Sequence, residues 1–389
     1  MLEGNELPLI GIKVIELSHM VMGPSMGLIL ADLGADVIKV EPEGGDKTRK
    51  LPGSGAGYFA MYNRNKRSIC IDMQSGEGRE VIEKLISEAD VVLENFRPGA
   101  LDKLGYDYES LAKVNPRLIY CSARGFLQGP YAHRTALDEV VQMMGGLAYM
   151  TGPPGRPLRA GASVVDVMGG MFGVIGILSA LEMRHRTGKG QQITSSLYES
   201  TVFLMGQHMA QNAVTGQPAA PMPARVSAWA VYDVFETRDA EKIFVGVVSD
   251  TQWELFCGEF GFTAFSENTE MDTNLGRVAL RDEIIPEVSA CFRSMSKDEL
   301  ITKLDKSGLP YAPISKPEDL SNDLHLKESG GLLNTEIPGG KIADLPALPI
   351  AINNHRLGIR RQVPKAGEHT AEVLSEIGFS EEQISLRTE

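Results

Sequence analysis

Short apolar segments alternate with amphipathic ones through the first 200 residues of the chain. The apolar segments are rich in Val and Ile, which predicts buried strands at residues 11–17, 36–41, 68–72, 91–94 and 118–122. The segments between and after them have helical periodicity, which predicts helices at residues 25–33, 77–88, 138–149 and 167–185. This alternation is typical of an α/β fold with a mostly parallel sheet that is covered by helices on both faces.

The pattern changes at residues 216–228, where Pro and Ala are concentrated, and we interpret this stretch as a linker. A smaller α+β domain is predicted at residues 229–329. Its strands are expected at 228–235, 242–248 and 309–314, and its helices at 252–260 and 277–295, with a further helix opened by a capping box at Ser296 and Glu299. Residues 330–389 are rich in Gly and Pro and end in two short helical patterns, at 368–377 and 380–385.

Composition adds limits on the partners of the protein. The 389 residues contain 38 Lys and Arg against 51 Asp and Glu, a net charge of −13, and a chain this acidic is not expected to bind nucleic acid over a broad surface. The uncharged run at residues 167–181 is shorter than the roughly 20 residues that span a bilayer, so we expect a buried helix and no membrane association.

The cysteines and the N-terminus indicate a cytoplasmic protein. Cys70, Cys121, Cys257 and Cys291 lie far apart and have no zinc-ligand spacing, so no metal is expected, and such isolated cysteines are typical of reduced proteins. Residues 1–8 carry neither the basic nor the apolar region of a signal peptide.

Common catalytic motifs are absent from the sequence. There is no GxGxxG, P-loop, GxSxG or HExxH motif, so a nicotinamide oxidoreductase in particular is disfavoured. Two features remain. Residues 63–68 carry three cations just before a strand, which indicates either an anion site or a solvated basic face. Asp166 precedes the uncharged helix, where its position alone favours a structural N-cap over a chemical role.

Seven segments, in order along the chain, resemble the class III CoA-transferases. This is the family of formyl-CoA transferase and carnitine CoA-transferase, and it also includes α-methylacyl-CoA racemase. The segments are GIKVIEL at 11–17, GADVIKVE at 34–41, NRNKRSI at 63–69, ADVVLENFRPGAL at 89–101, PLRAGASVVD at 157–166, RTGKGQ at 186–191 and GEHT at 367–370.

The resemblance implies a fold and an assembly. Similar proteins have a Rossmann-like large domain, here residues 1–215, which the segment 330–389 returns to complete, and a small domain, here 229–329. Two subunits interlock like chain links, so an interlocked homodimer is expected. The cofactor requirement is limited to coenzyme A itself, as a co-substrate.

The resemblance also implies residue roles. Asp166 falls on the nucleophilic aspartate of the family, and the basic cluster is now favoured as a site for CoA phosphates. The residues expected to bind CoA are His19, Met20, Val21, Met22, Arg49, Lys66, Arg67, Ile71, Asp72, Met73, Asn95, Phe96, Arg97 and Lys103.

The implied reaction moves CoA from an acyl-CoA to a free carboxylic acid. Asp166 attacks the thioester to give an aspartyl anhydride, and an aspartyl-CoA thioester follows. We expect backbone N–H groups at the start of the 167–185 helix to stabilise the oxyanion, and polar contacts to keep Asp166 ionised. Arg156, Arg159 and Arg225 are candidate partners for a second carboxylate, which would suit a short dicarboxylate such as succinate or a branched C5 diacid.

Two departures from the family pattern bear on the substrate. Pro42 stands where relatives often carry a basic residue, and residues 226–231 replace the glycine-rich loop of formyl-CoA transferase, which argues against formyl-CoA and oxalate. A racemase of 2-methylacyl-CoA is the main alternative, but it needs two acid/base groups, and Leu137 stands where related racemases carry His. A catalytically silent CoA-binding protein is disfavoured because Asp166 is present.

Overall fold

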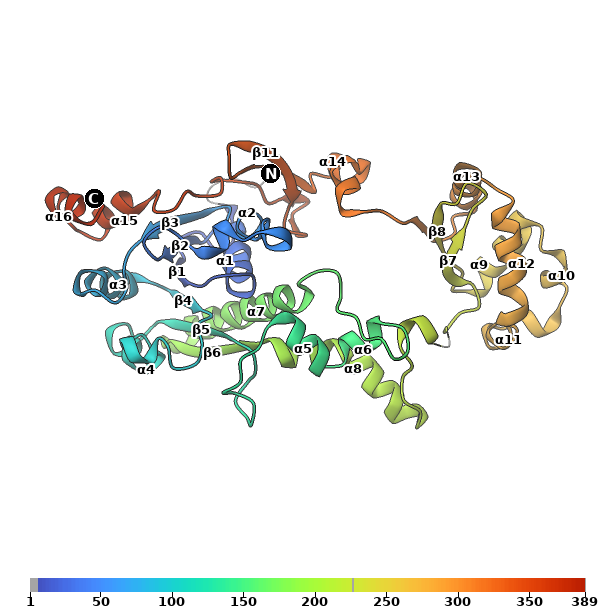
Figure 1. Ribbon diagram of the computed structural model, residues 1–389, viewed down its shortest axis with the longest axis horizontal. Helices are drawn as coiled ribbons and strands as arrows, with labels where there is room; N and C mark the ends of the chain where they lie inside the picture. Colours follow the sequence, from blue (N-terminus) through green and yellow to red (C-terminus); the bar gives the residue numbers. More distant parts are fainter. Residues whose placement is uncertain (1–5, 226, 389) are drawn as a thin grey trace. The chain divides into compact units, whose positions relative to one another are not determined.

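The computed structural model describes residues 6–225 and 227–388. Residues 1–5, which belong to the segment examined for a signal peptide, lie outside the described residues. The same holds for Val226, which belongs to the predicted linker and to the segment 226–231. The chain divides into two compact units (Figure 1): residues 1–223 together with 321–389 form the first, and residues 224–320 form the second. The predicted small domain, 229–329, overlaps most of this second unit.

A parallel sheet of six strands forms the centre of the first unit, in the order β3-β2-β1-β4-β5-β6. This confirms the predicted α/β fold with a mostly parallel sheet. Residues 66–70 and 191–196 form strands at the two edges, and the second of these, QQITSS, is too polar to have been predicted. The strands are β1 Lys13–Leu17, β2 Asp36–Glu41, β3 Lys66–Cys70, β4 Val91–Glu94, β5 Ile119–Arg124 and β6 Gln191–Ser196.

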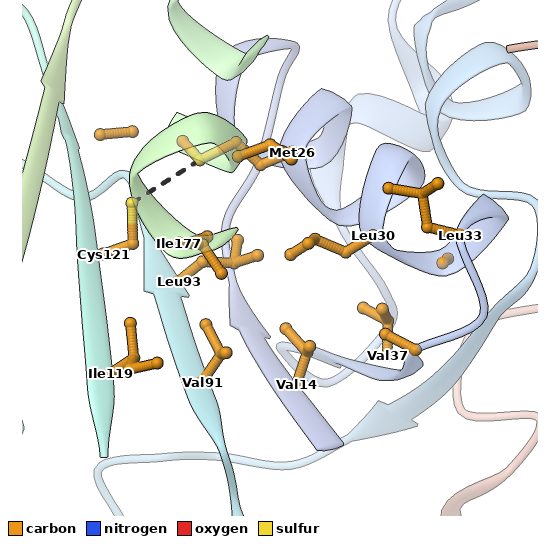
Figure 2. Close-up of a cluster of buried hydrophobic side chains, with 14 of the residues drawn as sticks. Val14, Met26, Leu30, Leu33, Val37, Val91, Leu93, Ile119, Cys121 and Ile177 are labelled. Carbon is orange, nitrogen blue, oxygen red and sulfur yellow. Dashed lines mark hydrogen bonds between the residues drawn. The ribbon is translucent and has the colours of Figure 1, made fainter. Parts of the chain in front are cut away.

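Each face of the sheet is covered by helices because alternate strand residues point to opposite faces. On one face Val14 and its neighbours pack against α1 Met22–Asp32 and α7 Val164–Thr187, and Figure 2 shows Met26, Leu30 and Ile177 reaching down to the strands. On the other face Ile15 and its neighbours pack against α3 Gly76–Glu88, α4 Tyr108–Val114 and α15 Thr370–Glu376. Helix α15 comes from the far end of the chain, so the C-terminal segment completes the core of this unit.

Several predicted helices have different bounds in the structure. The predicted helix at 138–149 is two helices, α5 Asp138–Met144 and α6 Leu147–Thr151, because Gly146 adopts a left-handed φ of 88° between them. Helix α8 Leu197–Thr215 and the hairpin of β10 Leu332–Ile337 with β11 Lys341–Pro346 were not predicted. The remaining helices and strands of this unit are α2 Tyr58–Tyr62, α14 Leu324–Glu328, α16 Glu381–Thr388, β12 Ala351–Ile352 and β13 His355–Arg356. It also has the 3-10 turns Lys47–Lys50, Gly53–Gly55 and Asp102–Leu104. Two further 3-10 turns, Met222–Ala224 and Pro317–Asn322, lie at the junctions with the second unit.

Helix α7 is longer than predicted and begins before Asp166. Its 24 residues are long and apolar enough, by length and composition alone, to cross a membrane, so the length of the helix does not support the expectation of no membrane association, which stays a prediction. One side of the helix is buried in the core through Val174, Ile177 and Leu181. Gly173 allows this packing, because an added Cβ would lie 2.3 Å from the sulfur of Met26.

The second unit has its own core around a three-stranded antiparallel sheet. The capping box predicted at Ser296 and Glu299 is present at the start of its last helix. The elements of this unit are β7 Tyr232–Glu236, β8 Lys242–Gly246, β9 Tyr311–Pro313, α9 Asp250–Phe260, α10 Thr263–Ser266, α11 Asn274–Ala279, α12 Arg281–Arg293, α13 Lys297–Ser307 and the 3-10 turn Thr269–Met271.

Candidate active site

A cavity of about 900 Å³ opens at the carboxyl ends of β1 to β4. Ligands of open α/β sheets bind at this edge, beside the point where the strand order reverses, and here that point lies between β1 and β4. The loops after four strands supply the lining. The lining residues are Ser18, His19, Met20, Val40, Glu41, Pro42, Glu43, Asp46, Lys47, Thr48, Leu51, Ile71, Asp72, Met73, Gln74, Phe96, Ala100, Leu101 and Leu104.

The chemistry of this lining is apolar and acidic rather than basic. Ile71, Met73 and Phe96 offer apolar surface, whereas Lys47 is the one cation among the described lining residues. The interior therefore suits the uncharged parts of a nucleotide or acyl chain, and phosphate groups would need cations at the rim.

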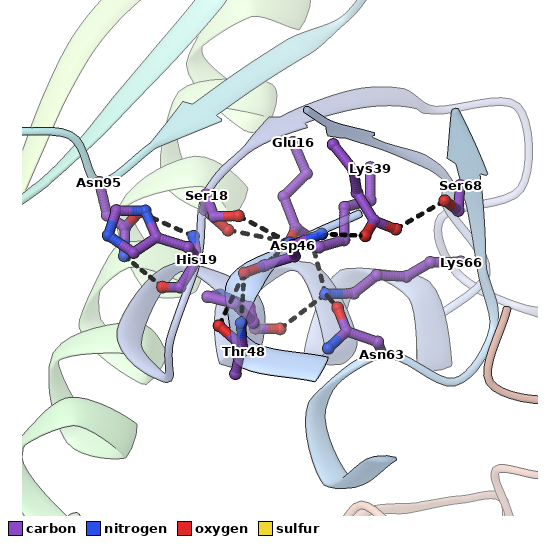
Figure 3. Close-up of polar contacts among 12 residues, drawn as sticks. Glu16, Ser18, His19, Lys39, Asp46, Thr48, Asn63, Lys66, Ser68 and Asn95 are labelled. Atoms are coloured by element: carbon purple, nitrogen blue, oxygen red, sulfur yellow. Dashed lines mark hydrogen bonds and ion pairs between the residues drawn. The ribbon is translucent and has the colours of Figure 1, made fainter. Parts of the chain in front are cut away.

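The loop after β1 is fixed to the loop after β4. The backbone N–H of His19 donates to Oδ1 of Asn95 at 3.0 Å, and Nδ2 of Asn95 donates back to the carbonyl of His19 at 2.7 Å (Figure 3). The rings of His19 and Phe96 meet edge to face at 5.6 Å. Burial lowers the pKa of His19 more than Asp46 raises it, so the imidazole is neutral at neutral pH.

The structure brings six of the fourteen predicted CoA-binding residues into this cavity lining: His19, Met20, Ile71, Asp72, Met73 and Phe96. Of the others, Asn95 holds the His19 loop from behind, and Val21 and Met22 are buried at the start of α1. The side chain of Met22 faces Gly169 on α7, where an added Cβ would lie 2.8 Å from its terminal carbon.

The prediction that Lys66 and Arg67 present free cations to CoA phosphates is wrong. Lys66 is fully buried and lies 2.7 Å from Oε2 of Glu16, and burial lowers its pKa to about 8 despite that partner. Arg67 donates to Asp36, Glu372 and Glu376 and so attaches α15 to the edge of the sheet. Burial opposes the charge of Arg67, but its hydrogen bonds to Asp36 and Glu376 raise its pKa above the ordinary value.

The other predicted cations divide into one paired and two exposed side chains. Arg49 binds Glu41 through Nη2 at 2.6 Å and stacks over the ring of Phe59 at 3.6 Å. Burial raises the pKa of Glu41, but hydrogen bonds led by Arg49 outweigh it and hold the pKa below the ordinary value. Arg97 and Lys103 are exposed on the segments that also carry the lining residues Phe96 and Leu104, and neither forms an ion pair with the residues that the structure describes.

Asp166 lies in the first turn of α7, three residues after the N-cap residue Ser163. The prediction from sequence that Asp166 is the N-cap residue of this helix is therefore wrong. The Asp166 side chain does not cap the helix and is available for chemistry. The carboxylate is half-buried, and it receives no hydrogen bond from the side chains and backbone of the described part of the chain. Asp166 is not among the residues that line the cavity, and it differs from the buried lining carboxylates Glu41 and Asp46, which pair with Arg49 and Lys39.

Asp138 is the first residue of α5, and its side chain caps the N-terminus of α7. Ser163, the N-cap residue of α7, forms no such hydrogen bond with its side chain. Its Oδ2 atom accepts the backbone N–H groups of Val165 at 3.0 Å and Asp166 at 3.1 Å. Its Oδ1 atom accepts Nε2 of Gln142 at 2.5 Å, and Oε1 of Gln142 accepts the N–H of Ala160 at 2.8 Å. Asp138 and Gln142 are both buried, so this chain of contacts fixes the backbone on which Asp166 stands.

The surroundings of Asp166 raise its pKa to about 7. Burial is the main cause, the negative charges of Asp138 and Glu139 add to it, and Arg159 opposes it. The expectation that polar contacts keep the carboxylate ionised is therefore corrected: Asp166 is only partly ionised at neutral pH. A carboxylate with a raised pKa is a stronger nucleophile than an ordinary one once it has lost its proton.

The expected oxyanion donors at the start of α7 are also occupied. Asp138 takes the N–H groups of Val165 and Asp166, and the N–H of Val167 donates to the carbonyl of Ser163 at 3.1 Å. These three N–H groups therefore fix the start of the helix and are not free to bind a developing oxyanion.

Of the arginines predicted to hold a second carboxylate, Arg159 lies within electrostatic reach of Asp166. Arg159 contacts Glu139 through Nη1 and lies 3.5 Å from Oδ1 of Asp138 through Nη2. Arg156 is exposed in the turn after α6, and Arg225 belongs to the second unit.

Sequence reasoning missed Asp138, Gln142 and Tyr62 as site residues. Tyr62 ends α2, and its pKa is raised by burial first and then by the charge of Asp166, which places the two side chains within electrostatic reach. The signal for Asp138 was its position at the start of a helical pattern, which alone indicates no more than a cap. Among the described residues, no group of three or more His, Cys, Asp or Glu side chains is arranged to hold a metal ion.

Comparisons with known proteins agree on one family. The sequence matches CoA-transferase family III over residues 9–370. A succinate–glutarate CoA-transferase from Agrobacterium fabrum is 36% identical, over 95% of this chain and 96% of the relative. The human succinyl-CoA:glutarate CoA-transferase is 32% identical, over 96% of this chain and 86% of the relative. A formyl-CoA:oxalate CoA-transferase from Shigella sonnei is 33% identical, over 97% of each chain.

Solved structures give the same result. A CAIB/BAIF family protein from Brucella suis superposes with a TM-score of 0.83 at 36% identity, over 95% of this chain and 99% of the other. A hypothetical protein from Mycobacterium tuberculosis gives 0.82 at 27% identity, over 94% and 99%. The chain belongs to CoA-transferase family III. It is an enzyme that moves CoA from an acyl-CoA to a carboxylic acid.

Proposed function

We propose that this CoA-transferase works through Asp166 as a covalent nucleophile and that its acceptor is a short dicarboxylic acid. The observation that carries the first part is the half-buried Asp166 carboxylate, which is unpaired among the described residues while Asp138 fixes its backbone. An unpaired carboxylate with a raised pKa has no structural role to perform, and its reactivity is the property that its surroundings favour.

The reaction balances in four steps. Ionised Asp166 attacks the acyl carbonyl of the donor, the C–S bond breaks, and an aspartyl anhydride and CoA thiolate result. The thiolate then attacks the aspartyl carbonyl, which gives aspartyl-CoA and releases the donor acid with one oxygen from Asp166. The acceptor carboxylate attacks aspartyl-CoA and expels thiolate to form a second anhydride. Thiolate attacks the acceptor carbonyl, and Asp166 leaves as a carboxylate that now carries one oxygen from the acceptor.

A short dicarboxylate fits the charges around Asp166. Arg159 lowers the pKa of Asp166, so it lies within electrostatic reach of the reacting carboxylate, and its side chain is 35% exposed. A planar guanidinium can bind the distal carboxylate of a diacid in a bidentate manner. The relatives from Agrobacterium and human, whose names state succinate and glutarate as substrates, support the same class of acceptor.

We place CoA in the cavity after β1 to β4, with its phosphates at the rim. The apolar side chains of Met73 and Phe96 suit the adenine and pantetheine parts, and exposed Lys47, Arg97 and Lys103 suit the phosphates. This assignment keeps six of the residues predicted from sequence inside the cavity and transfers the phosphate role from the buried Lys66 and Arg67 to the rim.

A second copy of the chain is the expected partner, and we propose that it covers α7 and α8. Large apolar side chains on these two helices are exposed in the single chain: Met171 by 50%, Ile175 by 56%, Phe203 by 73% and Met209 by 60%. An apolar patch of this kind marks a protein interface in a soluble protein. Sedimentation should give a dimer, and Phe203→Glu should shift the protein towards monomer.

Oxygen labelling tests the nucleophile directly. The enzyme would turn over acetyl-CoA with succinate labelled by ¹⁸O in both carboxylates, and the tryptic peptide 160–184, which contains Asp166, would be analysed by fragmentation mass spectrometry. We expect first one and then two ¹⁸O atoms at Asp166, while the peptide 135–159, which contains Asp138, stays unlabelled. Transfer to succinate without label at Asp166 would exclude the aspartyl route. Deuterium entering the α-carbon of a 2-methylacyl-CoA in D₂O, without acyl exchange, would instead indicate a racemase.

A further inference from the structure

Met20 adopts a backbone conformation that methionine rarely takes, at the edge of the cavity. Its φ is +65°, in the left-handed region, where a side chain costs roughly 1–2 kcal/mol. Met20 is 40% exposed and lines the cavity, so core packing does not compensate for this cost. Hydrogen bonds of Met20 itself and of the preceding residue, His19, compensate for this cost.

Met20 donates its own bond to a buried threonine on the loop after β2. The backbone N–H of Met20 donates to Oγ1 of Thr48 at 3.2 Å. Oγ1 of Thr48 donates its proton to Oδ1 of Asp46 at 2.8 Å (Figure 3). The Thr48 N–H reaches the same oxygen at 2.8 Å. Because the hydroxyl has one proton and Asp46 accepts it, the lone pair that faces Met20 is held in an accepting orientation.

Asp46 is in turn fixed by a network of buried charges. Its Oδ2 lies 3.2 Å from Nζ of Lys39, and Lys39 also donates to the carbonyl of Ser18 at 2.6 Å, directly before the loop. Lys39 lies 3.3 Å from Glu16, whose other oxygen pairs with Lys66. Burial opposes the charge on Lys39, but Glu16 and Asp46 outweigh it and raise its pKa, so the lysine is a permanent cation.

This network is neutral and fully buried beneath the cavity. Two lysines, Lys39 and Lys66, face two carboxylates, Glu16 and Asp46, and none of the four side chains is more than 7% exposed. Glu16 and Lys39 are register partners on β1 and β2, so the sheet itself fixes their separation. The network is therefore a rigid base, and Thr48 is the connection between this base and the strained residue Met20.

We propose that Thr48 is a positioning residue for acyl-CoA binding, which acts by holding the Met20 loop in the conformation that shapes the cavity. The inference rests on the proposed location of the CoA site. When the Thr48 hydroxyl is removed, the hydrogen bond of Met20 that offsets its unfavourable left-handed conformation is lost, and the loop relaxes. The free energy needed to restore the loop is then subtracted from the binding free energy of CoA.

The experiment compares Thr48→Val with Thr48→Ser and with Thr335→Val. Thr335 is also fully buried, and its hydroxyl donates to a backbone carbonyl in β10, away from the cavity. We expect Thr48→Val to raise the Kd for CoA and the KM for acetyl-CoA about tenfold, which corresponds to about 1.4 kcal/mol, with a change in kcat of less than about threefold. Thr48→Ser should restore both constants, and Thr335→Val should leave them unchanged.

Met20→Gly gives a second readout that does not depend on the stability of the Thr48 variant. Glycine removes the side chain and the left-handed penalty together, so the melting temperature should stay equal or rise while the Kd for CoA increases. In a double-mutant cycle, Thr48→Val should add much less to the Kd in the Met20→Gly background than in the wild type. Additive effects would overturn the proposal, because the two residues would then act independently.

One further variant separates this inference from the assignment of the cavity. Ala100 lines the cavity, and Ala100→Trp fills it. Loss of CoA binding in Ala100→Trp with a normal Kd in Thr48→Val would overturn the positioning role and leave the cavity assignment standing. A normal Kd in Ala100→Trp would overturn the cavity assignment, and the positioning role with it.

Discussion

Oδ2 of Asp138 accepts the backbone N–H of Asp166 at 3.1 Å, and the negative charge of the same Asp138 side chain raises the pKa of the Asp166 carboxylate. One residue thus orients the nucleophile and sets the pH at which it is ionised. These two effects are separable, because an amide oxygen can accept the same hydrogen bonds without carrying the charge.

Asp138→Asn should therefore move the pH profile of the enzyme. Asp166 must be ionised to attack, so kcat/KM rises with pH through the pKa of about 7 in the wild type. Removing the neighbouring charge lowers that pKa, and the acidic limb should shift to lower pH by about one unit. The plateau of kcat/KM at high pH should also fall, because the new amide NH₂ group faces the Nε2 donor of Gln142. Two donors cannot hydrogen-bond to each other, so the start of α7 is held less firmly. Steady-state kinetics between pH 5 and 9 measure both changes.

Glu139→Gln is the matched control for this shift. Glu139 is exposed and also raises the pKa of Asp166, but the α7 backbone N–H groups of Val165 and Asp166 donate to Asp138 and not to Glu139. Glu139→Gln should shift the acidic limb of the profile to lower pH by less than Asp138→Asn does. The plateau of kcat/KM should not fall, because the position of α7 is unchanged. A profile that stays at the wild-type pH in Asp138→Asn would mean that the acidic limb belongs to another group.

The raised pKa of Asp166 also has a consequence for stability. A carboxyl group whose folded pKa lies above its unfolded value of 3.8 favours folding when protonated, and this contribution is lost as the pH rises through about 7. Asp166→Asn should therefore melt at the same temperature as the wild type below pH 4 and several degrees higher above pH 7. Calorimetry at a series of pH values checks this, and a constant difference at all pH values would contradict it.

Arg159→Gln tests the dicarboxylate acceptor. If Arg159 binds the distal carboxylate, its loss removes charge-assisted hydrogen bonds worth about 1.5–3 kcal/mol, so kcat/KM for succinate and glutarate should fall roughly tenfold to hundredfold. Butyrate and pentanoate lack that carboxylate and should be transferred almost as before. Rates must be compared well above pH 7, because Arg159 also lowers the pKa of Asp166. An equal loss for diacids and monoacids would remove Arg159 from substrate recognition.

The sequence allowed the architecture of the first unit to be predicted because its strands and helices have clear periods. β2 and β4 were predicted with their exact bounds, and the helix at 77–88 begins one residue earlier in the structure. The edge strand β6 was missed because its residues, QQITSS, are polar and it pairs with the distant β5. The hairpin of β10 and β11 was missed because it lies in a segment that is rich in Gly and Pro.

The site was harder to predict, because charge in a sequence does not indicate burial. Lys66 and Arg67 look like an anion site until the fold places Glu16, Asp36 and the helix α15 against them. The missed signal was the strand pattern itself. Glu16 follows two apolar residues in β1 and Lys39 follows two apolar residues in β2, and such interruptions of neighbouring parallel strands can face one another beneath the ligand edge.

Gly27 on α1 makes the buried pair of Glu16 and Lys66 possible. A Cβ at this position would lie 1.8 Å from Oε2 of Glu16 and 2.9 Å from Nζ of Lys66, so Gly27→Ala must displace one of two fully buried charges. Alanine normally stabilises a helix relative to glycine, but here we expect a loss of about 3–5 kcal/mol, the cost of separating a buried ion pair. Gly76→Ala, at the exposed start of α3 with open space around it, is the control and should be neutral or slightly stabilising. Urea unfolding of both variants measures the difference, and an unchanged midpoint in Gly27→Ala would mean that the pair adjusts freely and is not the rigid base of the cavity.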